Sequence, residues 1–366
     1  MLFLQDGDNV AIPQVSEKVG GKSVGSMRLL IIGAGASLEE ATQSGNANAQ
    51  PFPTIRNMGS YWMVTGLSAC VHIACAAYLD SKGITYNKKV LELFTGDRES
   101  LAEEEGGNAP LQVFQKAAHD NPQDHNVETV CEFVWQNQGQ RNKEFWASFA
   151  EHTVYLPLFG MQFEHFFENG VGWKQLRASH IVAKQLSSDD RIINLNYDTV
   201  FEIGAKQLGM RLSYFPNKQP NEVLIYKPHG SINLYVNPAH GDMYFVEPDE
   251  IYGTFHLPDQ RGGTFHPSHG IIPPRLNKSY AQHPVSAWIL EDAGTMTPDV
   301  VTFWGVGLTS SDKDLEDFYI AACKKARRIE FINPDEEAYK KVCSITGTIV
   351  TWFQSLDAWA TATTAE

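Results

Sequence analysis

The sequence predicts an α/β fold in which helices flank a mostly parallel sheet, with a helical subdomain inserted after the first strand. Short apolar runs, typical of buried parallel strands, alternate with helix patterns along much of the chain. Several of these runs end in glycine-rich or polar segments, as strands do where they lead into a turn. From about residue 60 to 190 the apolar residues recur mainly at helical spacing.

In chain order, the first expected strand covers residues 29–32 and leads into the glycine-rich turn 33–37. Residues 42–57 are loop-like because they contain glycine, asparagine and two prolines. Helical spacing then predicts three helices, at residues 61–79, 126–135 and 173–186. Asn126 is a candidate N-cap for the second of these helices.

The pattern changes near residue 190, where strands and helices alternate. Strands with their exit residues are expected at 191–198, 223–226, 300–304 and 328–334, the last of which should be the final strand. Helices are expected at 199–208 and 314–326. Residues 236–285 are rich in glycine, proline, histidine and aromatics, so a long excursion with hairpins is expected there.

The length of 366 residues suits about two domains, or one large domain that carries an insertion. Residues 1–27 are expected to be an irregular lead-in. Residues 28–59 and 191–366 should together form the α/β domain. Residues 60–190 should form the inserted helical subdomain.

Composition and charge exclude several classes of protein. The formal net charge of −14 argues against direct nucleic-acid binding, because such proteins neutralise phosphates with a surplus of Lys and Arg. The five cysteines include no C-x-x-C pair, so neither a four-cysteine zinc site nor a disulfide framework is expected. The N-terminus lacks a signal-peptide pattern, and no run of about 18 apolar residues is present. A cytoplasmic protein with reduced thiols and no membrane span is therefore predicted.

Candidate chemistry lies at the ends of the expected strands. In parallel α/β sheets, ligands bind outside the carboxyl ends of the strands. Segments rich in glycine or polar residues follow five of the expected strands, at residues 33–37, 196–198, 229–231, 305–312 and 333. We expect these segments to converge on one edge of the sheet.

The turn at residues 33–37 has two interpretations. Its small residues would let backbone amides approach a phosphate, helped by the dipole of the helix that follows. It is not a complete dinucleotide fingerprint, however, because Leu38 stands where a third glycine is needed and no acidic residue follows about 20 positions later. A turn between a strand and a helix also favours small residues for packing alone.

The polar candidates also have structural alternatives. Asn196 and Asp198 would bind ribose hydroxyls or position a water, or they would cap the helix that begins near Thr199. His229 would act as a general base near neutral pH, or it would be one of several structural histidines. His266 and His269 form an H-x-x-H pattern, but without further ligands no zinc site is expected.

The set of motifs, in this order, resembles the sirtuin-like superfamily, whose fold is a Rossmann-like parallel sheet. The match is limited to short separate segments between about residues 28 and 335. The residues that carry it are Gly33, Ala34, Gly35, Ser37, Asn196, Tyr197, Asp198, His229, Gly230, Gly305, Gly307 and Asn333. The sequence is even more similar to the sirtuin-like branch of bacterial antiphage defence systems. That branch shares the N-Y-D motif, the H-G-S motif with Ser231, an I-I-P-P segment (271–274) with Lys278, and the 304–312 strand exit.

The chain departs from deacylating sirtuins in two places. The four-cysteine zinc module is missing, and residues 50–56 replace the G-I-P-D-F-R segment, which leaves open whether Arg56 reaches the cofactor. The resemblance therefore implies that NAD is bound as a substrate, without zinc, and that it is hydrolysed rather than used for protein deacylation. The products would be nicotinamide and ADP-ribose.

The resemblance also implies roles for the matched residues. Asn196, Asp198 and His229 would face the nicotinamide ribose as catalytic residues. The turn with Gly33, Ala34, Gly35 and Ser37 would hold the pyrophosphate. The remaining cofactor-binding residues would be Tyr197, Gly230, Ser231, Gly305, Gly307 and Asn333, of which Asn333 and the loop at Gly305 would hold the adenosine ribose.

An unregulated NAD hydrolase would kill its host, so the family implies gating by self-assembly or by a partner. The expected partners are a second copy of the chain, a HerA-like ATPase, a short Argonaute or a nucleotide-sensing subunit. The sequence names neither the partner nor the trigger, nor does it tell whether the isolated chain is active. Two other classes stay open: a zinc-free deacylase or ADP-ribosyltransferase, and a non-catalytic subunit that binds NAD or ADP-ribose. A dehydrogenase is disfavoured by the incomplete fingerprint.

Overall fold

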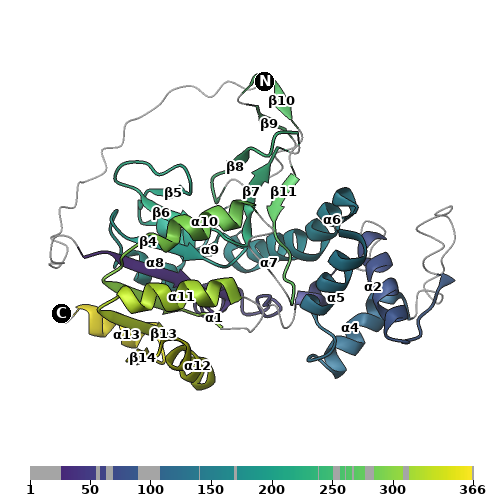
Figure 1. Ribbon diagram of the computed structural model, residues 1–366, viewed down its shortest axis with the longest axis horizontal. Coiled ribbons are helices and arrows are strands. Elements are labelled where there is room, and N and C mark those ends of the chain that lie inside the picture. Colours follow the sequence, from purple (N-terminus) through teal and green to yellow (C-terminus); the bar gives the residue numbers. More distant parts are fainter. Residues whose placement is uncertain are drawn as a thin grey trace.

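A seven-stranded sheet forms the centre of the protein in the computed structural model (Figure 1). The structure describes residues 26–54, 58–62, 69–89, 108–139, 141–168, 171–237, 239–249, 256–259, 261–265, 268–276, 284–307 and 313–364. The strand order is β14-β13-β12-β1-β4-β6-β5, and every neighbouring pair is parallel. The strands are β1 (Arg28–Ile32), β4 (Arg191–Asn194), β5 (Leu212–Tyr214), β6 (Val223–Tyr226), β12 (Val300–Trp304), β13 (Arg328–Ile332) and β14 (Thr351–Phe353). The predicted α/β fold with a parallel sheet is confirmed.

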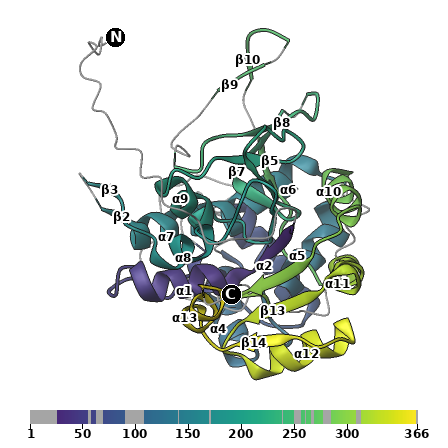
Figure 2. The same cartoon turned by 90° about the vertical axis from the view of Figure 1, so that its left-hand side faces the viewer.

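Helices cover both faces of this sheet, which explains why its strands are mostly apolar. In β1, Leu29 and Ile31 face one layer of helices, whereas Leu30 and Ile32 face the other. The first layer consists of α10 (Pro284–Gly294), α11 (Lys313–Lys325) and α12 (Glu336–Thr346). The second consists of α1 (Ala34–Ser44), α8 (Arg177–Ala183), α9 (Val200–Gln207) and α13 (Leu356–Thr364), on the opposite side in Figure 2.

Further helices lie between β1 and β4 in the chain and beside the sheet in space (Figure 1). They are α2 (Ala69–Ser81), α4 (Pro110–Asp120), α5 (Val127–Val134), α6 (Lys143–Ala150) and α7 (Leu156–Phe166), with π-helical turns at Trp135–Gly139 and Glu151–Tyr155. Their shared core also includes Tyr197, Ile232 and Ile271 from the sheet region. By contrast α8, although inside the range 60–190, packs against α1 and α9. The predicted domain limits stay a prediction.

The helix expected at 126–135 is confirmed as α5, whose N-cap Asn126 accepts a hydrogen bond from the Thr129 amide at 3.0 Å. The helix expected at 173–186 is shorter, because Phe167–Glu168 (β2) and Gly172–Trp173 (β3) form a small antiparallel ladder before α8 begins. Of the helix expected at 61–79, residues 63–68 lie outside the described residues. The preceding Met58–Tyr61 form a 3-10 turn, and α2 begins at Ala69 in the described part.

A second, antiparallel sheet follows β6 and was missed in part. Its order is β11-β7-β8, with β7 (Gly230–Val236), β8 (Met243–Phe245) and β11 (Ser268–Ile271). Together with the hairpin of β9 (Leu257–Pro258) and β10 (Thr264–Phe265), it accounts for the expected excursion. The expectation that residues 328–334 form the final strand is wrong, because β14 follows and pairs with β13.

Candidate functional site

The carboxyl ends of the strands meet at one edge of the sheet and bring the predicted segments together. β1 is followed by the turn at Gly33, β4 by Asn196, β6 by His229, β12 by Gly305 and β13 by Asn333. The strand order reverses at β1, with the chain continuing to β4 on one side and to β12 on the other. Such a switch point leaves a crevice where doubly wound sheets bind their ligands.

Close backbone packing accounts for the glycines on both sides of this crevice. The amides of Gly33 and Gly35 donate to the carbonyls of Trp304 and Gly305, both at 2.9 Å. A Cβ at Gly33 or Gly35 would lie 2.6 or 2.8 Å from the Gly305 carbonyl oxygen, too close for any side chain. These two amides are therefore engaged within the protein, and the phosphate-binding role of the turn stays a prediction.

Gly305 offers a direct test of this packing. Its φ of +62° favours glycine, and a Cβ there would lie 2.1 Å from the Ala36 amide nitrogen. Gly305→Ala is expected to lower the free energy of unfolding by about 1–3 kcal/mol, measured by chemical denaturation. Gly307→Ala is the matched control, because nothing lies within 4 Å of its Cβ position. Equal effects of the two substitutions would contradict the packing argument.

Three polar side chains form a buried group beside the turn. The Asn196 amide nitrogen donates to the Gly33 carbonyl at 3.0 Å and to the Ser37 hydroxyl oxygen at 2.9 Å. The Ser37 hydroxyl donates in turn to the Asp198 carboxylate, 3.0 Å from either oxygen. Asp198 also accepts from the amide of Val200, the first residue of α9, at 3.1 Å, although the N-cap residue of that helix is Thr199. Ser37 thus joins the turn after β1 to the loop after β4.

A buried lysine lies directly behind this group. Lys227 donates from Nζ to the Asp198 carbonyl oxygen at 2.9 Å and to Glu202 Oε1 at 3.0 Å, and the side chains of Lys227 and Glu202 are fully buried. Burial raises the pKa of Asp198 to about 6, an effect that Lys227 opposes and Glu202 reinforces. Asp198 is therefore mainly ionised at neutral pH. Neither Lys227 nor Glu202 was predicted as a site residue from the sequence, although a lysine directly after a wholly apolar strand was an available signal.

His229 is oriented by its backbone neighbours. Its Nδ1 lies 2.8 Å from the Leu195 carbonyl oxygen, so Nδ1 carries a proton and Nε2 is the basic nitrogen of the neutral ring. The ring of Tyr197 lies 5.7 Å away, and its hydroxyl donates to the Ile272 carbonyl at 2.7 Å. The Ile272 amide donates to the His229 carbonyl at 3.0 Å, which ties the I-I-P-P segment to the histidine.

Two neighbours of His229 connect it to β7. Gly230 has a φ of +81°, and a Cβ there would lie 1.9 Å from the Gly270 carbonyl oxygen. The Ser231 hydroxyl donates to the Tyr197 carbonyl at 3.1 Å. These contacts hold the start of β7 against the loop after β4. They account for the glycine at position 230 and the serine at position 231 without a bound ligand.

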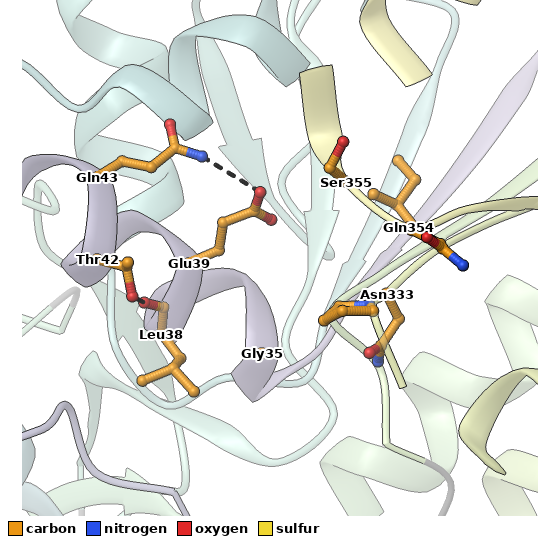
Figure 3. Close-up of a pocket in the computed structure, with 11 residues that line it drawn as sticks. Gly35, Leu38, Glu39, Thr42, Gln43, Asn333, Gln354 and Ser355 are labelled. Carbon is orange, nitrogen blue, oxygen red and sulfur yellow. Dashed lines mark hydrogen bonds between the residues drawn. The ribbon is translucent and has the colours of Figure 1, made fainter. Parts of the chain in front are cut away.

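A cavity of about 410 Å³ opens beside α1, at the ends of β12, β13 and β14. Three predicted cofactor-binding residues line it, Gly35, Gly305 and Asn333, whereas Gly307 is exposed and does not. The lining residues that the sequence analysis missed include Glu39, Thr42, Gln43, Gln354 and Ser355 (Figure 3). Those on α1 recur three or four positions apart, which places them on one helix face.

Several predicted features lie outside the described residues: Arg56, His266, Lys278 and residues 308–312. Within the described part, no cluster of three or more His, Cys, Asp or Glu is placed to hold a metal ion. In the same residues, no helix has the length and apolar character needed to cross a membrane.

Comparisons with known proteins give only distant likenesses. No family model matches the sequence, and no curated protein matches it. Among solved structures, the chain is similar to a Sir2 homologue, a triple mutant in complex with 2′-O-acetyl ADP ribose, with 14% identity, coverage of 93% and 92% of the two chains, and a TM-score of 0.35. A Sir2 homolog–NAD complex has 12% identity, coverage of 88% and 89%, and a TM-score of 0.30. The fold class therefore rests on the strand order and register described above.

Proposed function

We propose that the protein is a sirtuin-like NAD+ hydrolase that cleaves NAD+ to nicotinamide and ADP-ribose. The observation that carries this proposal is the buried group of Asn196, Ser37 and Asp198, with His229 nearby in the fold, at the switch-point edge of a parallel sheet. The sequence motifs that resemble sirtuins supply these residues. The cavity beside α1, which Gly35 of the turn at residues 33–37 helps to line, offers space for the dinucleotide.

The proposed reaction breaks the bond between ribose C1′ and the nicotinamide nitrogen. Nicotinamide leaves with the bonding electron pair, and the ribose develops positive charge until water adds at C1′. An ionised Asp198 would stabilise that charge, and its burial would strengthen the electrostatic effect. His229 Nε2 would take a proton from water or from a ribose hydroxyl, and Asn196 would position the reacting group.

The low exposure of these residues supports gating. Asn196, Asp198 and His229 are only 6%, 4% and 7% exposed, and in this proposal substrate reaches them after a local opening. We propose that assembly with a partner or with further copies of the chain drives this opening. A HerA-like ATPase, a short Argonaute and a nucleotide-sensing subunit are the candidate partners. In this proposal the protein is the NAD-depleting effector of an antiphage abortive-infection system.

The test is to incubate the purified protein with NAD+, alone and with the product of the neighbouring gene, and to quantify nicotinamide and ADP-ribose. His229→Ala is expected to lower turnover by at least about 100-fold, because a general base contributes that much or more. Asn196→Ala is expected to lower it as well. His240→Ala is the matched control, because His240 is an exposed loop residue.

Three other outcomes would redirect the proposal. Turnover that survives in both Asn196→Ala and His229→Ala would rule out this catalytic assignment. A strict requirement for an acylated peptide or another acceptor would identify a deacylase or ADP-ribosyltransferase. Tight binding of ADP-ribose without turnover, even with the partner present, would identify a non-catalytic binding subunit.

A further inference from the structure

The cavity beside α1 has an asymmetric charge. Among the described residues that line it, Glu39 is the only one with an ionisable side chain. Its polar neighbours carry neutral groups, the hydroxyls of Thr42 and Ser355 and the amides of Gln43 and Gln354. Within the described residues, the cavity lining thus offers hydrogen bonds and one negative charge, with no lysine or arginine to balance a bound anion.

The Glu39 carboxylate is held in a fixed position. It accepts from Trp304 Nε1 at 2.8 Å and from Gln43 Nε2 at 3.2 Å, and the nearby Leu356 backbone favours its charged form. Burial raises its pKa, and the Trp304 and Leu356 donors counteract this. A carboxylate has about four acceptor positions, and Trp304 and Gln43 use two of them among the described residues, so the group has an open acceptor position for a ligand there. Figure 3 shows the side chain extending from α1 toward Ser355.

A fixed carboxylate with one open acceptor position suits a sugar hydroxyl. Rossmann-type sites use an acidic side chain in this way, to bind the ribose 2′-hydroxyl of NAD. A 2′-phosphate in the same place would set its negative charge against the carboxylate, with no cation in the lining to compensate. We propose that Glu39 binds the adenosine ribose of the dinucleotide and makes the site selective for NAD+ over NADP+.

This inference rests on the proposed function, since it assumes that a dinucleotide occupies the crevice. A purely structural role for Glu39 is the competing explanation, because its contacts with Trp304 and Leu356 join α1 to β12 and α13. A loss of stability or of total activity would not separate the two explanations. The ratio of NAD+ to NADP+ use does, because it is independent of how much protein is folded.

The experiment compares kcat/KM for NAD+ and NADP+ in the wild type, in Glu39→Gln and in the exposed control Glu337→Gln. We expect the wild type to prefer NAD+ by at least about 100-fold, since like-charge contacts cost several kcal/mol. Glu39→Gln keeps an acceptor for Trp304 and should reduce the preference at least about tenfold, mainly by improving NADP+ use. The control should leave the ratio unchanged. Equal use of both dinucleotides by the wild type, or an unchanged ratio in Glu39→Gln, would overturn the inference.

Calorimetric titration with ADP-ribose and 2′-phospho-ADP-ribose separates this inference from the proposed hydrolysis. If no turnover occurs but ADP-ribose binds selectively and Glu39→Gln relaxes that selectivity, the hydrolase proposal fails and the role of Glu39 stands. If NAD+ is cleaved while both ligands bind equally well, the hydrolase stands and the role of Glu39 fails. If neither ligand binds even with the partner present, the role of Glu39 fails, and the NAD+ turnover assay alone decides the hydrolase proposal.

Discussion

Replacing Lys227 with methionine is expected to lower the free energy of unfolding by about 3–5 kcal/mol, because breaking a buried ion pair leaves an uncompensated charge. Lys227 and Glu202 are fully buried and lie 3.0 Å apart. Without the ammonium group, the Glu202 carboxylate keeps the Asn194 amide as a donor, at 3.1 Å, but loses its counter-charge beside Asp198. Chemical denaturation of the purified variant measures the loss.

Two comparisons show whether the loss arises from the buried charge. Adding Glu202→Gln to Lys227→Met should recover much of the stability, because it removes the unpaired carboxylate and leaves an amide that can still form hydrogen bonds. Lys340→Met is the surface control, since Lys340 pairs with Glu336 and Glu337 on an exposed helix face. It should change stability by less than about 1 kcal/mol. A Lys227→Met effect no larger than that of the control would refute the argument.

The strands that the sequence predicted are those buried on both faces. Residues 29–32, 191–194, 223–226, 300–304 and 328–332 all read as apolar runs, because helices cover both sides of the sheet. The convergence of the motifs followed from topology alone. Parallel strands deliver their carboxyl ends to one edge, so segments separated by more than 250 residues, such as those at Gly33 and Asn333, meet there.

The strands that were missed lacked such a signal. β5 and β14 have three residues each, too few for a periodic pattern, and they pair at the two edges of the sheet. β7 begins inside the H-G-S motif. The glycine of this motif suggested a loop, but Gly230, with its positive φ, is the first residue of the strand. Local sequence does not distinguish these cases.

Contacts in the site depend on tertiary structure in the same way. Lys227 and Glu202 are 25 residues apart, and nothing in either local sequence shows that they pair. Glu39 follows the predicted turn closely but gains its position from Trp304, 265 residues later. The glycines, conversely, were predicted for a ligand, and backbone packing between two turns already accounts for Gly33, Gly35 and Gly305.

Asp198→Asn is expected to lower NAD+ turnover by about 10²–10³-fold, because it removes the charge proposed to stabilise the positive ribose. In the wild type, turnover should fall as the pH drops below about 6, where the raised pKa of Asp198 lets the carboxylate protonate. Initial rates between pH 5 and 8 measure both effects. Asp120→Asn is the control, because Asp120 is exposed at the end of α4 and should leave the rate unchanged.

Asp198→Asn should increase the stability of the fold at neutral pH, although it lowers turnover. The pKa of Asp198 is raised on folding from 3.8 to about 6, so its stabilising contribution holds below about pH 4 and is lost as the pH rises through about 6. At 1.36 kcal/mol per pKa unit the loss is about 3 kcal/mol, which the neutral asparagine avoids. The free energy of unfolding of Asp198→Asn should therefore increase relative to that of the wild type as the pH rises from 4.5 to 8. A variant that loses turnover while gaining stability at high pH would mark Asp198 as a functional residue, because its charge lowers the stability of the fold that holds it. A loss of both would instead mark it as a structural residue that supports the start of α9.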